Sequence, residues 1–143
     1  APLARAGFLA AVRLGYYNYL TFRRVVPNCI LQGGSPSANE YCGDCPFMRD
    51  EVGGMHERGT IGISTRGPDT GDAQIFINLV DNPQFDFVSG ADANSRGYTV
   101  FGRVVEGMEV LDGMRGVPTK PREGISEAVP LQPIIIQHAQ QRD

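Results

Sequence analysis

The sequence predicts a mainly β fold, a closed antiparallel barrel with two α-helices over its ends. The chain has 143 residues, of which 41% are apolar, and this length suits a single domain over residues 1–143 with a sizeable core. Its 18 Gly and 10 Pro divide it into short segments, which favours many strands over a helix bundle. Only two well-separated segments have helical periodicity. A closed barrel uses several short strands without leaving open edges.

The first helix is expected over residues 2–14, because Pro2 suits a first helical position and apolar residues follow at helical spacing. Gly15 can end this helix in a left-handed conformation. The second helix is expected over residues 106–115, where apolar residues recur at i,i+3 and i,i+4, with Gly116 as its cap.

A hairpin is expected over residues 20–34. Two short apolar runs flank Pro27-Asn28, a dipeptide that favours a turn, and Gly33-Gly34 ends the second run. Further strands are expected at residues 61–64, 74–79, 98–105 and 131–137. In the second of these, Ile75 and Ile77 alternate with Gln74, Phe76 and Asn78, which is the period of a strand. The stretches between the expected strands are expected to be loops: residues 35–59, 66–72, 86–97 and 117–130.

Arg24 occupies an unusual place in this hairpin. Side chains alternate faces along a strand, so Phe22, Arg24 and Val26 are expected on one face, while Gln32 shares a face with Ile30. Both long polar side chains could extend to water, as arginine commonly does. They could instead be a guanidinium and an amide fixed against an apolar groove. Spacing alone leaves both interpretations open.

Composition weighs against several classes of function. The net charge is −3 and no basic cluster is present, so nucleic-acid binding is not expected. No apolar run approaches about 18 residues, so a membrane-spanning helix is not expected either. The sequence begins at Ala1-Pro2 and shows no signal peptide, which leaves a cytoplasmic or a periplasmic or secreted location open.

Three cysteines are too few for a disulfide scaffold, and two of them form Cys42-Gly43-Asp44-Cys45. A zinc site needs about four ligands, and the other candidates are Cys29, His56 and His138. A redox motif would place its first cysteine at the start of a helix. We favour either a local disulfide or two ordinary thiols over metal or redox chemistry.

Three ordered segments together resemble the cyclophilin-type peptidyl-prolyl isomerases. FRRVVPNCILQGG at residues 22–34 resembles the family signature, GPDTGDAQIFIN at residues 67–78 its second active-site segment, and YTVFGRVVEGM at residues 98–108 its third. The resemblance extends over nearly the whole chain and has bacterial-type features. It implies an eight-stranded antiparallel barrel capped by two helices. Members usually have a strand pair before the first helix, so we expect an N-terminal hairpin that is cut away, disordered or in an omitted segment.

The resemblance also implies roles for individual residues. Arg24 is the donor that stabilises a rotating X-Pro bond, and Gln32 helps to position the substrate. Phe76 forms the floor of a proline pocket and Ile30 its wall. The other substrate-binding positions are Cys29, Ser64, Thr65, Gln74, Phe85 and Tyr98. No metal or cofactor is required, because only a rotation is accelerated.

Several positions depart from the family pattern. Cys29 replaces the usual Phe, which would widen the pocket, and Thr65 replaces an Asn that contacts the substrate backbone. Arg66 replaces Ala beside a secondary pocket, where it could favour acidic residues or simply be a solvated charge. Gln84 occupies a position where many members have an aromatic ring that contacts cyclosporin-type macrocycles, so weak binding of these compounds is expected.

The expected function is isomerisation of X-Pro bonds in proline-containing peptides and in unfolded or folded client proteins, by a monomer, as an aid to folding. The alternative is a proline-binding or chaperone-like module with little turnover, because Cys29 and Thr65 erode the usual substrate contacts. A third, weaker hypothesis is redox regulation through Cys42 and Cys45.

Overall fold

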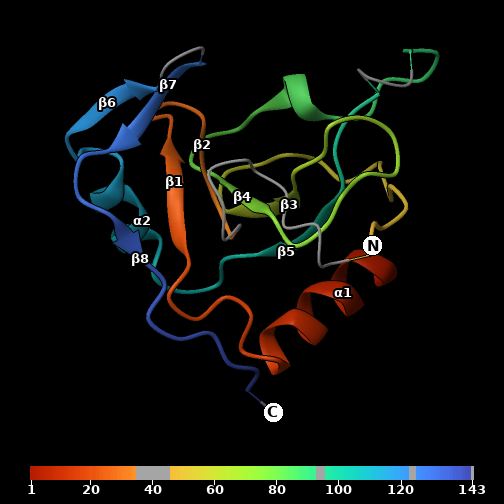
Figure 1. Cartoon of the computed structure of the whole chain (residues 1–143). Coiled ribbons are helices and arrows are strands. Elements are labelled where there is room, and N and C mark those ends of the chain that lie inside the picture. The colour runs from red at the N-terminus through yellow and green to blue at the C-terminus, as the bar shows by residue number, and fades with distance from the viewer. Residues whose placement is uncertain (35–45, 93–95, 123–124, 143) are drawn as a thin grey trace.

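The computed structural model describes residues 1–34, 46–92, 96–122 and 125–142 (Figure 1). This part of the chain forms two α-helices, one 3₁₀ helix (η1) and eight strands. In chain order they are α1 Pro2–Arg13, β1 Thr21–Val25, β2 Ile30–Gly33, β3 Thr60–Ile63, β4 Ile75–Asn78, η1 Pro83–Phe85, β5 Val100–Arg103, α2 Met108–Met114, β6 Thr119–Arg122, β7 Ile125–Pro130 and β8 Ile134–Ile135.

Six strands form one antiparallel sheet in the order β5-β3-β4-β2-β1-β8, and β6 pairs with β7 in a second sheet. The β6–β7 pair lies beside β1 (Figure 1). Within the four described ranges, no ladder joins the outer strands β5 and β8, so the expected closure into a barrel is not present there. The fold is mainly β with two α-helices.

The six-stranded sheet has two different faces because side chains alternate along each strand. Ile75, Ile77 and Leu79 of β4 and its extension are buried on one face, which is the core face. Phe76 and Asn78 are buried on the other face, beneath the segments that include η1. The predicted alternation along residues 74–79 is therefore confirmed, although both faces are covered.

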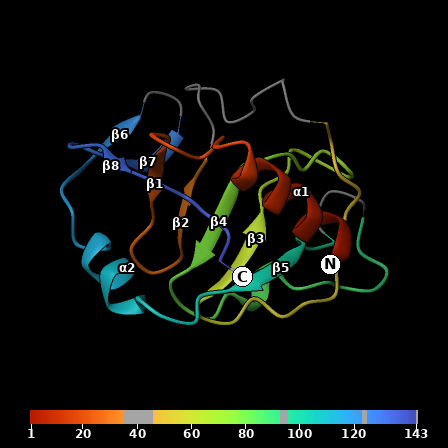
Figure 2. The same ribbon diagram turned by 90° about the horizontal axis from the view of Figure 1, so that it is seen from below.

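The two helices cover different ends of the core face (Figure 2). Ala4 and Phe8 of α1 pack against the isoleucines of β3 and β4. Leu111 and Met108 of α2 pack against the core residues of β1, β2 and β4. Each helix therefore covers one end of the core face, whereas the opposite face of the sheet is covered by the segments that include η1.

The first helix ends as predicted, at a left-handed glycine. Gly15 has φ of 69° and its N–H donates to Val12, while the N–H of Tyr16 donates to Ala11. These two hydrogen bonds give partners to backbone carbonyl groups that would otherwise be unpaired at the end of the helix. The second helix begins at Met108, two residues later than predicted, because Gly107 at φ 89° interrupts the helical backbone. Gly116 is not in a left-handed conformation at its end.

A β-bulge in β1 corrects the predicted faces of the hairpin. Phe22 pairs with Gly33 and Arg24 pairs with Gln32, so Arg23 is an extra residue on β1. As a result Phe22 and Val25 both contact the core, and Arg24 faces the opposite side of the sheet beside Gln32. The prediction that Phe22 and Arg24 share a face was wrong, because strict alternation does not survive an inserted residue.

The prediction of a loop over residues 117–130 was also wrong, because this segment contains β6 and β7. Pro121 lies within β6, next to an irregularity in its pairing with β7, and Pro130 ends β7. Proline is tolerated in a two-stranded sheet of edge strands, where one side of each strand needs no ladder bonds. The expectations for Cys42 and Cys45 fall outside the described residues.

No helix in the described part of the chain is long and apolar enough to span a membrane.

Candidate active site

A cavity of about 300 Å³ lies on the face of the sheet opposite the core. Its polar side comprises Arg24, Gln32, Ser64 and Thr65. Its apolar side comprises Cys29, Ile30, Phe76, Phe85 and Tyr98. These residues come from β1, the turn before β2, β2, β4, η1 and the segments that follow β3 and precede β5. Nine of the ten residues expected from the sequence therefore line one cavity.

A chain of hydrogen bonds runs through the polar side. Arg24 Nη1 donates to Gln32 Oε1 at 3.0 Å. Gln32 Nε2 donates to Ser64 Oγ at 2.9 Å and to Gln74 Oε1 at 3.1 Å. Both amide hydrogens of Gln32 are thus used, and its oxygen is turned toward the guanidinium.

Gln74 is the expected site residue that does not line the cavity. It is 2% exposed and lies behind Gln32. Its contact with Gln32 makes it a support for the site in this structure. Arg66 and Gln84 are exposed and are not part of the cavity lining either, and Gln84 Nε2 donates to Asn82 Oδ1 at 2.9 Å.

Phe76 is 3% exposed and lies over Gly62 of the neighbouring strand. A Cβ atom at Gly62 would clash with the Phe76 ring, coming within 2.7 Å of Cε1. The glycine therefore leaves space for the outer edge of the ring beside β3. Phe85 and Tyr98 meet Phe76 edge-on, each with its ring centroid 5.8 Å away.

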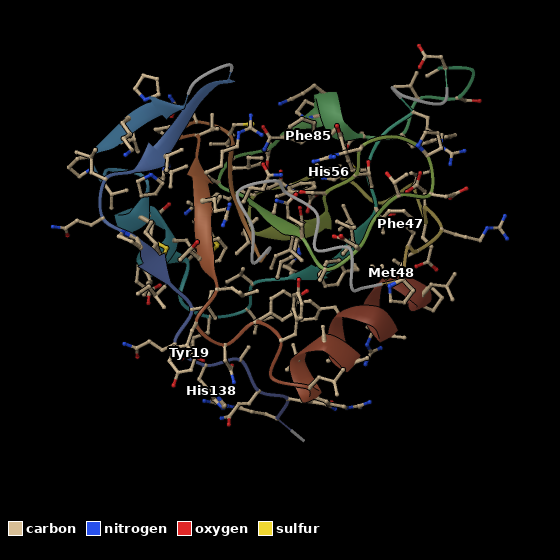
Figure 3. The ribbon with its side chains drawn as sticks, viewed as in Figure 1. Tyr19, Phe47, Met48, His56, Phe85 and His138 are labelled. Atoms are coloured by element: carbon tan, nitrogen blue, oxygen red, sulfur yellow. The ribbon has the colours of Figure 1, made fainter. Side chains whose placement is uncertain are left out.

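His56 completes this aromatic cluster and was not expected there from the sequence. Its ring stacks on Phe76 at a centroid distance of 5.6 Å and an interplanar angle of 16°. Figure 3 shows His56 and Phe85 close together near η1, while His138 lies far away beside Tyr19. Burial lowers the pKa of His56, and the hydrogen bond to the Tyr98 carbonyl and the Asp86 carboxylate oppose this only partly.

Sequence reasoning missed His56 and Gly62. A glycine within a strand commonly indicates close approach by another group, so Gly62 had a local indication. His56 had none, because its partners Asn78 and Tyr98 are 22 and 42 residues away in the chain.

Cys29 lies at the apolar wall near Arg24. Burial raises the pKa of its thiol, and the positive charge of Arg24 opposes this to a smaller extent. The side chain is therefore a neutral, moderately apolar part of the wall at neutral pH.

The site combines a cation and an oriented amide with an apolar pocket of aromatic rings. Such a site suits a neutral, partly apolar group that gains hydrogen-bonding capacity as it reacts. In the described ranges, no group of three or more His, Cys, Asp or Glu side chains is arranged to hold a metal ion.

Comparison with known proteins identifies the class. Residues 1–141 match the family profile described as cyclophilin type peptidyl-prolyl cis-trans isomerase/CLD. The chain is 38% identical over 140 residues to a peptidyl-prolyl cis-trans isomerase of Acinetobacter baylyi, covering 95% of this chain and 72% of that protein. It is 37% identical over 141 residues to peptidyl-prolyl cis-trans isomerase B of Escherichia coli, covering 96% and 85%.

The fold has relatives among solved structures. The crystal structure of a Cryptosporidium parvum cyclophilin, determined in the presence of the dipeptide Ala-Pro, matches with a TM-score of 0.77 at 25% identity. The match covers 99% of this chain and 87% of that one. The chain therefore belongs to the cyclophilin-type peptidyl-prolyl cis–trans isomerases.

Proposed function

We propose that this protein accelerates cis–trans rotation of X-Pro bonds and that Arg24 is the group that stabilises the twisted bond. Resonance keeps the amide planar and creates a barrier of about 18–20 kcal/mol. Twisting breaks that resonance and leaves a lone pair on the proline nitrogen. A charged donor at this nitrogen stabilises the twisted state more than either planar state, which is the requirement for catalysis.

Gln32 contributes by orientation. Its amide is fixed on one side by Ser64 and Gln74, and on the other side its oxygen accepts from Arg24. This arrangement limits the positions that the guanidinium can take over the cavity. The hydrogen bond of 3.0 Å between Arg24 and Gln32, beside the Phe76 floor, is the observation that carries the proposal.

The apolar side would hold the proline ring. Phe76 offers a flat surface, and Ile30 and Cys29 flank it, so a pyrrolidine ring there would be removed from water. Removal of water favours the twisted state, because hydration of the carbonyl stabilises the planar amide. Ser64, Thr65, Phe85 and Tyr98 would contact the residues on either side of the proline.

The magnitudes are consistent with this division of labour. Uncatalysed exchange takes tens to hundreds of seconds, so a typical enzyme rate of about 10–10³ s⁻¹ requires roughly 4–7 kcal/mol of differential stabilisation. One charge-assisted hydrogen bond supplies about 1.5–3 kcal/mol. Arg24 therefore provides part of the effect, and the water-excluding pocket provides the remainder.

The test is the exchange rate of a short X-Pro peptide, measured by NMR with and without protein. Wild type is expected to accelerate exchange saturably, and Arg24→Ala is expected to lose most of that acceleration. Arg103→Ala is a matched control, because it removes an exposed arginine that pairs with Glu57 away from the cavity. Equal rates for wild type and Arg24→Ala would contradict the assignment.

A proline-binding module with little turnover is the second candidate. The position of Cys29 on the wall favours it, since a thiol covers less of a proline ring than the larger side chain usual in the family. Saturable binding of the peptide without faster exchange would select this function over catalysis.

We also propose that the sheet closes into a barrel and that residues 1–143 act as one domain and as a monomer. The outer strands β5 and β8 are the edges that closure would pair. Protection of their outward-facing amides from hydrogen exchange would support closure, and rapid exchange would contradict it.

A further inference from the structure

His56 is a buried ionisable side chain that the proposed mechanism leaves unused. It is 2% exposed, and its ring stacks on the floor of the cavity at Phe76. It also meets Phe85 edge-on at 5.8 Å and Tyr98 at 6.4 Å. Its backbone N–H donates to Asp86 Oδ1 at 2.7 Å. His56 thus lies behind three residues that line the cavity.

The hydrogen bonds of the ring determine its protonation state. Nε2 lies 3.2 Å from the carbonyl oxygen of Tyr98, which can only accept, so Nε2 bears the proton. Nδ1 lies 3.2 Å from Nδ2 of Asn78, which can only donate, so Nδ1 accepts. The ring is therefore neutral.

The side-chain amide of Asn78 cannot flip to present its oxygen to a second proton on the His56 ring. Its Nδ2 also donates to Thr60 Oγ1 at 2.8 Å, and its Oδ1 accepts from Asn82 Nδ2 at 2.8 Å. Thr60 Oγ1 in turn donates to the carbonyl of Glu57, so it must accept from Asn78. A proton at Nδ1 of His56 would face the N–H of Asn78 inside a buried cluster, and this arrangement is costly.

We propose that neutral His56 is a positioning residue for the proline pocket. Protonation at Nδ1 disrupts the packing of its ring against Phe76 and Tyr98 and thereby weakens peptide binding. This inference rests on the proposed function, because it takes the Phe76 cavity as the peptide site. Protonation is expected to raise KM and leave the turnover of bound peptide nearly unchanged, since Arg24 keeps its charge throughout.

The charged groups around His56 agree with a neutral resting state. Asp86, which follows η1, accepts from the backbone N–H of His56, and its charge opposes the effect of burial on the pKa of His56 only partly. In the same segment as His56, Glu57 pairs with Arg103, and Arg58 pairs with Asp112. β3 and β4 present Thr60, Phe76 and Asn78, which have no charge, and Tyr98 presents its carbonyl. The described residues thus show no carboxylate bonded to either ring nitrogen that would hold a proton there.

The first test uses wild type alone. Titration of both histidine rings is followed by NMR, with and without a saturating short peptide that contains Ala-Pro. If binding requires the neutral ring, the bound peptide must lower the pKa of His56 further, by reciprocity. His138, exposed and distant, is the internal control. An unchanged pKa of His56 on binding would overturn the proposal.

The second test measures peptide affinity against pH. In wild type, binding should weaken as the pH falls below the pKa of His56, by at most about tenfold per pH unit. His56→Gln retains a donor toward Tyr98 and cannot titrate, so its affinity should be roughly two- to tenfold weaker than wild type at neutral pH and independent of pH. His138→Gln should behave as wild type. Wild-type affinity that stays constant down to acid unfolding would overturn the proposal.

Two further readouts separate the possible failures. His56→Phe keeps a ring on Phe76 and cannot titrate, so it serves if His56→Gln does not fold. A general loss of structure would lower the concentration of active protein and therefore the apparent kcat, whereas a positioning role raises KM alone. If Arg24→Ala exchanges peptide as fast as wild type while the His56 linkage holds, the proposed function fails and the inference about the pocket stands.

Discussion

Arg24 and Gln32 are cross-strand partners in the β1–β2 hairpin, and Arg24 Nη1 donates a 3.0 Å hydrogen bond to Gln32 Oε1. The bulge at Arg23 is what brings them to the same face, because it reverses the alternation between Phe22 and Arg24. Bulges commonly redirect a side chain next to an active site. The site depends on this irregularity as much as on the residue types.

The first prediction concerns the coupling of this pair. Gln32→Ala should slow catalysis because the guanidinium loses its fixed partner, and Arg24→Ala should slow it more. If Gln32 acts through Arg24, the double variant should be no slower than Arg24→Ala alone, with a coupling of about 0.5–3 kcal/mol in kcat/KM. Strictly additive losses would show that the two residues act independently.

The second prediction concerns the floor of the cavity. Gly62→Ala should push the Phe76 ring from β3, at a cost of about 1–3 kcal/mol in the free energy of unfolding, and should raise KM. Gly102→Ala is the matched control on the neighbouring strand β5, where the nearest atom to a new Cβ is Ile61 Cδ1 at 3.8 Å. Similar losses of stability in both variants, measured by urea denaturation, would contradict the role assigned to Gly62.

The third prediction concerns stability in acid. Burial lowers the pKa of His56 in the folded chain, so below about pH 6.5 the unfolded chain binds more protons than the folded one. The free energy of unfolding should therefore fall as pH falls below about 6.5 and have its full value above it. Urea denaturation at several pH values should show a smaller decrease for His56→Gln than for wild type. Equal decreases would assign the effect to other groups.

The fourth prediction concerns Cys29. Burial raises the pKa of its thiol, so alkylation at neutral pH should be slower than for an unstructured cysteine and should increase at higher pH than usual. A Cys42→Ser/Cys45→Ser variant leaves Cys29 as the single thiol of three, and mass spectrometry follows its modification. A proline peptide should protect it. Rapid alkylation at neutral pH, unaffected by peptide, would contradict its place in the wall.

The fifth prediction concerns cyclosporin-type macrocycles. Wild type should bind them weakly, since Gln84 is exposed and bonded to Asn82 where an aromatic ring is usual in the family. Gln84→Trp should strengthen binding, and its fluorescence is a specific reporter because the chain has no other Trp. Gln137→Trp, at another exposed position, is the control. Equal affinities for the two variants would reject the explanation.

Local patterns were sufficient for much of the fold. The alternation around Ile75 and Ile77 predicted a strand, and Pro2 and Gly15 predicted the limits of the first helix within one or two residues. The prediction failed where pairing overrides local preference. Residues 117–130 were expected to be a loop, yet they contain two strands that pair with each other, and Pro121 and Pro130 lie within them.

The candidate site could be predicted in composition but not in geometry. The resemblance to the family motifs predicted Arg24, Gln32 and Phe76 as site residues, and these three residues line one cavity. The bulge at Arg23 could not be predicted, because Arg23 and Arg24 are the same residue type and the sequence does not show which of them is the extra residue. His56 depends on contacts with Asn78 and Tyr98, which only the folded chain brings together.

The most direct test of the central claim compares Arg24→Ala with wild type at saturating X-Pro peptide, with the peptide dissociation constant measured separately. A group that stabilises only the twisted bond should affect turnover far more than binding. We predict that the exchange rate at saturation falls about 10- to 100-fold while the dissociation constant changes by less than about threefold. An unchanged exchange rate, or a loss confined to binding, would contradict the account.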